Sequence, residues 1–131
     1  MTVKKNNFVK LGEITLVNTQ ATIFQKNSDE NFQTGLIFSE TKNKPIGMIS
    51  TEDLEFFFVK LMKINIKKLL NKNCDLISKS IKFSDDIELN KLLISSSFVI
   101  KKTTNLVFTK TELSLNEKKI IAFSNSIWKI N

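Results

Sequence analysis

An amphipathic pattern over residues 51–66 constrains the fold more than any other feature of this sequence. Apolar residues recur there at spacings of three and four, which is the period of one helix face. They are Leu54, Phe57, Phe58, Leu61 and Ile64. Ser50 can cap the free amides at the helix start, and Asp53 follows three residues later, as in a capping box. Such a helix needs an apolar surface to cover, and the flanking segments predict a sheet that provides it.

The residues before this helix have the pattern of two short strands. In the segment 35–39, Leu36 and Phe38 lie on one face of a strand and Ile37 lies on the other. The polar residues 40–44 predict a turn. Residues 45–49 contain one proline and one glycine and predict a return strand.

The other segments predict further strands and two more helices. Strands are expected over residues 8–17, 21–25, 32–39 and 76–83, and a hairpin joins residues 97–102 to 106–115 through a turn at 103–105. Acidic residues after Ser84 predict a short helix over 87–94, and Asn116 predicts the cap of a closing helix over 117–128. The acids of these helix starts, Asp85, Asp86 and Glu88, and likewise Glu52, Asp53 and Glu55, are interpreted as groups that stabilise the helix dipole.

The second half of the sequence resembles the first. The segment LVFTKTEL at 106–113 repeats the pattern of LIFSETKN at 36–43, and an apolar segment follows each copy. We therefore predict a single domain over residues 1–131, built from pseudo-repeats of about 1–66 and 67–131. The predicted fold class is α+β: duplicated strand-strand-helix units form one curved antiparallel sheet, with equivalent helices over 51–66 and 117–128.

The absence of several residue types restricts the possible chemistry. The sequence contains no His, Arg or Tyr, so it has no imidazole base and no His ligand for a metal. Three glycines leave no phosphate-binding loop, and the lone Cys74 cannot form an internal disulfide. No apolar run approaches the roughly 18 residues of a membrane span, so no membrane partner is expected. We predict a binding protein, not an enzyme, with no catalytic residue, metal or cofactor. Its net charge of +7 favours a polyanionic partner.

The segment 36–53 resembles the TATA-box-binding protein family. The matching residues are Leu36, Ile37, Phe38, Ser39, Lys42, Gly47, Ser50, Glu52 and Asp53. In the second copy, residues 106–108 and the pair at 122–123 with Asn125 are similar to the corresponding strand and last helix of that family. The family has two wedge phenylalanines in each repeat, whereas this sequence supplies one in each, Phe38 and Phe108.

This resemblance implies a saddle with its helices on the convex face. Its concave face would bind and bend A·T-rich double-stranded DNA through the minor groove. The implied DNA-binding residues are Leu36, Phe38, Lys42, Leu106, Phe108 and Lys110. The implied role is that of a general transcription initiation factor, with other general transcription factors and the RNA polymerase machinery as partners. The implied location is the nucleus, or the cytoplasm in a prokaryote.

Other interpretations of the same residues remain open. Residues 44–54 also resemble the end of a CBS repeat, in which Ser50 and Asp53 would bind the ribose and phosphate of ATP or AMP. A duplicated module of the Whirly or PUR type would instead bind single-stranded nucleic acid. Phe38 and Phe108 could equally be core residues, which would remove them from any DNA-binding surface.

Overall fold

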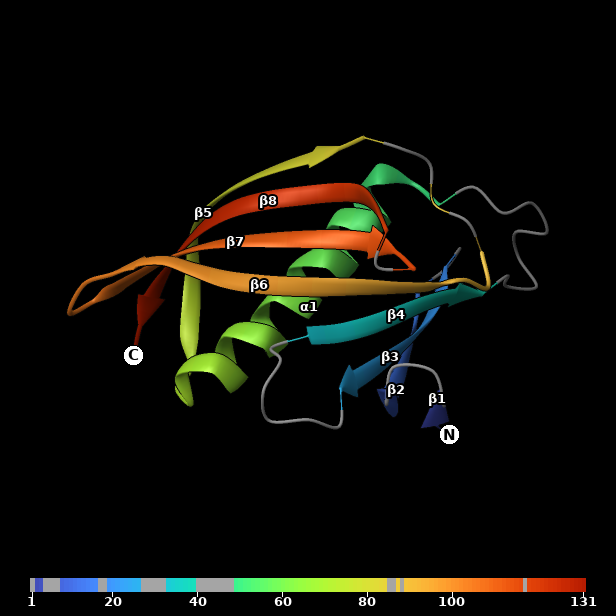
Figure 1. Cartoon of the computed structure of the whole chain (residues 1–131), viewed down its shortest axis with the longest axis horizontal. Coiled ribbons are helices and arrows are strands. Elements are labelled where there is room, and N and C mark those ends of the chain that lie inside the picture. The colour runs from blue at the N-terminus through green and yellow to red at the C-terminus, as the bar shows by residue number, and fades with distance from the viewer. Residues whose placement is uncertain are drawn as a thin grey trace.

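The protein forms one antiparallel sheet with a long helix packed across one of its faces (Figure 1). The computed structural model describes residues 2–3, 8–16, 19–26, 33–39, 49–84, 87, 89–116 and 118–131. Its elements are β1 (Thr2–Val3), β2 (Phe8–Thr15), β3 (Gln20–Lys26), β4 (Gln33–Ser39), α1 (Thr51–Leu70), β5 (Cys74–Phe83), β6 (Leu92–Lys102), β7 (Leu106–Leu115) and β8 (Lys119–Ile130). The strand order is β1-β2-β3-β4-β6-β7-β8-β5, so β4 pairs with β6 while α1 and β5 intervene in the sequence.

Local sequence signals fix both ends of α1. The Ser50 side chain accepts a hydrogen bond from the Asp53 backbone amide at 3.1 Å, which confirms the predicted cap. At the other end, Asn71 takes a left-handed conformation with φ of 53°, a common way for a helix to stop. Lys67 and Lys68 lie in the last turn, where positive charge is favourable.

The core lies between α1 and the concave side of the sheet, which curves round the helix (Figure 1). The largest core residues that the helix contributes are Phe57, Phe58, Leu61, Met62 and Ile66, and those of the strands include Leu36, Phe38, Leu93 and Trp128. The Phe38 and Phe57 rings pack edge to face with their centroids 5.3 Å apart.

A buried polar network ties α1 to the middle of the sheet. The Asn65 side-chain amide donates to the hydroxyls of Ser95 at 2.9 Å and Ser97 at 3.0 Å. Ser95 shares a hydrogen bond with Thr34 at 2.6 Å, and Ser97 shares one with Thr111 at 2.8 Å. Buried polar groups are costly unless they are paired, so this network specifies where along the sheet the helix sits.

The predicted saddle of duplicated strand-strand-helix units is wrong. In the described part of the chain there is one helix, and the sheet wraps round it instead of presenting an open concave surface. The boundary between the predicted halves, at residues 66 and 67, falls inside α1. The predicted strands over 8–17, 21–25, 32–39 and 76–83 and the hairpin around 103–105 correspond to β2, β3, β4, β5 and the β6–β7 pair.

Two predicted helices are strands or turns. The segment predicted as the closing helix is β8, where Ala122, Ser124, Ser126 and Trp128 face the core on every second residue. That alternation has the period of a strand, and pairing with β7 on one side and β5 on the other stabilises it. The predicted helix over 87–94 is replaced by a turn at 89–90 and by the start of β6.

The predicted turn at 40–44 and residues 45–48 of the predicted return strand lie outside the described residues, as do the acids Asp85, Asp86 and Glu88. The single helix among the described residues, α1, is too polar to cross a membrane.

Candidate functional site

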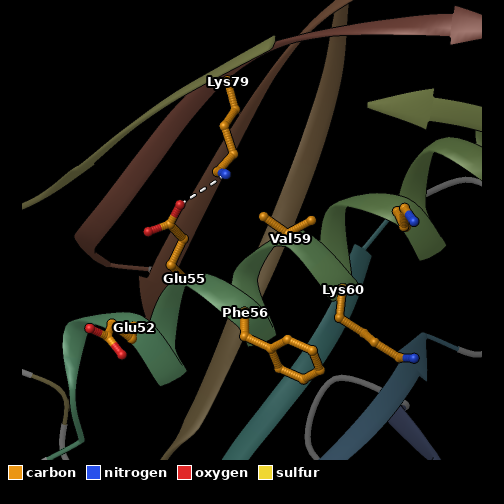
Figure 2. Close-up of a pocket in the computed structure, with 7 residues that line it drawn as sticks. Glu52, Glu55, Phe56, Val59, Lys60 and Lys79 are labelled. Atoms are coloured by element: carbon orange, nitrogen blue, oxygen red, sulfur yellow. Dashed lines mark ion pairs between the residues drawn. The ribbon is translucent and has the colours of Figure 1, made fainter. Parts of the chain in front are cut away.

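The outward face of α1 forms one wall of a pocket of about 490 Å³ (Figure 2). The lining residues are Glu52, Glu55, Phe56, Val59, Lys60 and Lys63 from the helix and Lys79 from β5. The helical residues follow one another at steps of three and one, so they form a single stripe opposite the buried stripe that contacts the sheet. The same helix therefore closes the core with one face and builds a pocket with the other.

A charged pair fixes the β5 side of the pocket. The Lys79 ammonium lies 2.9 Å from a Glu55 carboxylate oxygen, as the dashed line in Figure 2 shows. Lys79 pairs in register with Ser126, a core-facing residue of β8, so its side chain extends over the helix side of the sheet. Both partners are partly exposed, at 34% and 42% of their side-chain area. The pair orients the ammonium toward the helix and contributes little to stability.

The first turn of α1 carries two carboxylates with different surroundings. Asp53 accepts a hydrogen bond of 2.6 Å from the Thr19 hydroxyl, and Thr19 is buried. Glu52 lines the pocket one turn before Glu55 and forms no ion pair within the described part of the chain. Asp53 therefore serves the structure, whereas the Glu52 carboxylate is available to a bound molecule or a water.

The remaining lining residues divide the pocket into an apolar middle and a basic end. Phe56 and Val59 present apolar surface next to the charged pair, and the Phe56 ring is half exposed. Lys60 and Lys63 follow along the helix, and Lys63 lies about 16 Å from Glu52 along the axis, at 1.5 Å per residue. The pocket thus offers a carboxylate and an ammonium at one end and two ammonium groups at the other.

No other group in the described chain suits nucleophilic or metal chemistry. Cys74 lies on β5 and does not line the pocket, and burial raises the pKa of its thiol, which keeps it protonated. The described residues contain no cluster of three carboxylates, thiols or imidazoles that could hold a metal ion. The carboxylates of the pocket are therefore its candidate acid or base groups.

A second hollow of about 410 Å³ lies on the opposite face of the sheet. It is lined by Lys26, Gln33, Ser96, Glu112, Ser114, Lys118 and Ile120. The Gln33 side chain accepts from Lys26 at 3.1 Å and donates to Ser96 at 2.8 Å, so much of its polar lining is already paired. This hollow has no apolar middle like that formed by Phe56 and Val59.

The residues predicted to bind DNA do not share one surface. Leu36 and Phe38 are fully buried and face α1. Phe38 is therefore a core residue, as the alternative interpretation of the sequence expects. Phe108 and Lys110 alternate along β7 with Val107 and Thr109, which face the core, so they lie on the outer face of the sheet. Leu106 shares that outer face, Lys110 forms an ion pair of 3.4 Å with Glu112, and Lys42 lies outside the described residues. The two copies of the repeated pattern thus point to opposite faces.

From the sequence, Glu52 and Glu55 are interpreted as acids that stabilise the helix dipole, and Glu52 also matches the TATA-box-binding pattern. No sequence motif singles out Phe56, Val59, Lys60, Lys63 or Lys79. The stripe from Glu52 to Lys63 carried a usable signal, because a solvated helix face rarely keeps a large aromatic residue among its charges. The contribution of Lys79 depends on the pairing of β5 with β8, which no local pattern predicts.

Comparison with known proteins identifies the fold. A hypothetical thioesterase of Streptococcus pneumoniae, solved with coenzyme A, superposes with a TM-score of 0.65 at 8% identity, covering 95% of this chain and 97% of that one. A Streptococcus mutans protein bound to acetyl coenzyme A gives 0.63 at 9%, covering 100% and 93%. The PaaI protein of the E. coli phenylacetic acid degradation operon gives 0.62 at 10%, covering 77% and 74%. No family model and no curated protein matches the sequence. The chain has the hotdog fold.

These findings correct the predictions of family and function. The chain does not resemble TATA-box-binding proteins in structure, and the prediction of a DNA-bending transcription factor with DNA and polymerase partners is wrong. The CBS and Whirly or PUR alternatives are likewise unsupported, because the structures that share this fold include a hypothetical thioesterase and coenzyme A complexes. The prediction of a protein that is not an enzyme is contradicted as well, because the structures that share this fold include a hypothetical and a putative thioesterase. Its location in nucleus or cytoplasm stays a prediction.

Proposed function

We propose that this protein binds coenzyme A thioesters in the pocket beside α1 and hydrolyses the thioester bond. One observation carries the proposal: Glu52, a carboxylate that forms no ion pair with any described residue, lines the same pocket as an oriented ammonium, Lys79, with apolar surface and further lysines beyond them. The coenzyme A complexes among the structures with this fold support the choice of substrate class.

The proposed substrate matches the pocket in charge and polarity. Lys60 and Lys63 would bind phosphate groups of coenzyme A through charge-assisted hydrogen bonds. Phe56 and Val59 would contact the apolar chain next to the sulfur. A volume of about 490 Å³ is typical of small-molecule pockets and accommodates the thioester end, while the nucleotide extends along the exposed helix.

The proposed reaction uses the carboxylate as a general base. Glu52 accepts a proton from a water whose oxygen adds to the thioester carbonyl carbon. The Lys79 ammonium stabilises the negative charge that develops on the carbonyl oxygen, and Glu55 holds that ammonium in place. The carbon–sulfur bond then breaks, the proton passes to the departing sulfur, and a carboxylic acid and free coenzyme A leave. Glu55 is a positioning residue in this scheme.

The test of this function is the release of free thiol from acetyl-, hexanoyl- and palmitoyl-coenzyme A, followed with a thiol-reactive dye. The proposal expects saturable release from at least one of these esters. Absence of release from all three, while coenzyme A still binds, would leave a binding protein and remove the hydrolysis step.

Charge reversal at the basic end of the pocket should weaken substrate binding more than turnover. In the double variant Lys60→Glu and Lys63→Glu, we expect KM for acyl-coenzyme A to rise about 100-fold or more, since each of the two lost contacts to a charged group is worth about 1.5 kcal/mol or more, about tenfold. Both residues lie away from the thioester end, so kcat should change little. Steady-state thiol release measures both constants.

Lys118→Glu, compared with the single variant Lys60→Glu, is the matched control for this experiment. Lys118 is an exposed lysine that lines the hollow on the opposite face of the sheet, so its reversal changes the net charge without altering the pocket. Equal increases in KM for the control and for the pocket variants would show that only overall charge matters.

A further inference from the structure

The end of the β6–β7 hairpin exposes three consecutive apolar side chains. Phe98, Val99 and Ile100 have exposed fractions of 48%, 39% and 64%. Ile100 is the extra residue of a β-bulge, because Val99 pairs with Thr109 while Lys101 pairs with Phe108. Figure 1 shows this hairpin extending past α1 at one end of the molecule. Phe98 pairs with Lys110 on the outer face of the sheet, whereas Val99 pairs with the core-facing Thr109 and so lies on the helix side. The hairpin end therefore exposes apolar surface on both faces.

Lysines surround this hairpin end (the tip). Lys101 and Lys102 follow directly, and the Lys101 ammonium lies 6.0 Å from the centre of the Phe108 ring. Lys129 pairs with Leu106 at the hairpin turn, so it lies at the same end. Cys74 at the start of β5 pairs with Ile130, whose backbone amide donates to the Asn105 carbonyl in the hairpin turn at 2.8 Å, so Lys72 lies toward the same end.

We propose that this hairpin end docks on an anionic membrane surface. Phe98 on the outer face and Ile100 at the bulge would enter the headgroup region, and the neighbouring lysines would contact acidic lipids. The lysines beside these apolar residues give the hairpin end the charge that acidic lipids attract, which favours an anionic bilayer over an apolar protein surface. The net charge of +7 has the sign that an anionic surface attracts. The proposal does not depend on the thioesterase function.

The experiment is co-sedimentation of the whole chain with phosphatidylcholine vesicles, with and without phosphatidylserine. We expect binding to the vesicles that contain phosphatidylserine and little binding to the others. Ile100→Asp should lower the partition coefficient about 10-fold or more, because it places a charge at the buried tip. Lys101→Glu with Lys102→Glu should lower it about 25-fold or more, at about fivefold for each lost lysine.

The matched controls are Ile120→Asp and Lys118→Glu. Ile120 is 46% exposed, and both residues lie at the other end of the strands, beside the β7–β8 turn. These variants should bind vesicles as the native chain does. Equal losses in the controls and the tip variants would overturn the proposal.

A tryptophan at the tip gives an independent readout that does not require loss of binding. The native chain has one tryptophan, Trp128, which is fully buried. In Ile100→Trp, emission should therefore shift to shorter wavelength only when vesicles with phosphatidylserine are added. An unshifted spectrum would overturn the proposal. The proposal would also be overturned if the native chain bound no vesicles in sedimentation and instead formed a dimer that Ile100→Asp abolished. A second copy of the chain would then cover these residues.

Discussion

Replacing Glu52 by glutamine should lower kcat for thioester hydrolysis about 100-fold to 10,000-fold, which is the usual contribution of a general base. The amide keeps the shape of the side chain but does not accept a proton from water, so KM should change little. Glu52 caps no described backbone group, and its removal from the first turn should lower stability by only about 0.3 to 1 kcal/mol. Steady-state kinetics and a thermal melt of the same preparation separate these effects.

Glu112→Gln is the control for this prediction. Glu112 is a partly exposed carboxylate that pairs with Lys110 on the outer face of the sheet, away from the pocket. Its kcat should remain that of the native protein. A Glu52→Gln variant with native kcat would contradict the assigned role of Glu52. In that case Glu55→Gln, which also releases Lys79, would be the next variant to measure.

Replacing Phe38 by alanine should lower the free energy of unfolding by about 3 to 5 kcal/mol. Its ring is fully buried between β4 and α1 and packs against Phe57, so truncation removes apolar contacts and leaves a cavity. Urea unfolding followed by the fluorescence of Trp128, which lies in the same core cluster, measures this loss.

Phe98→Ala is the matched control for the core variant. Phe98 is 48% exposed on β6, so its truncation should lower stability by only about 1 kcal/mol. The sequence alone allowed Phe38 to be either an exposed wedge or a core residue. Similar losses for the two variants would contradict the core position of Phe38.

Segments whose structure depends on near neighbours in the chain were predictable from the sequence. The helix that starts after Ser50 follows from its cap and from the spacing of Leu54, Phe57 and Phe58, and both signals lie within a few residues. The hairpin through residues 103–105 is equally local, because Thr103 bonds to Leu106 across its own turn.

Segments that depend on distant partners were not predictable in this way. In β8, the buried residues Ala122, Ser124 and Ser126 are small or polar. The sequence therefore does not show the alternation of apolar and polar residues by which a strand is recognised. The position of β5 at the sheet edge results from pairing with β8, whose paired residues lie 39 to 56 positions later in the chain. The similarity of residues 36–38 to 106–108 wrongly predicted that Phe38 and Phe108 share one face of the sheet. Strand pairing turns Phe38 toward the helix and Phe108 away from it.

Only the helical part of the candidate site could be predicted from the sequence. Its helical stripe can be read from the spacing of Glu52, Phe56, Lys60 and Lys63, but a helix start explains acids equally well. The feature that distinguishes a pocket from a solvated helix face is Lys79, and its place opposite Glu55 follows from the tertiary fold.

The most direct test of the proposed function is a titration of the isotopically labelled protein with coenzyme A, followed by NMR. Because coenzyme A is a product, it binds without turnover and its position reports the substrate site. The account predicts chemical-shift changes at residues 52–63 of α1 and at Lys79, with saturation as ligand is added. Changes confined to the hollow around Gln33 and Ser96, or no changes at saturating coenzyme A, would contradict it.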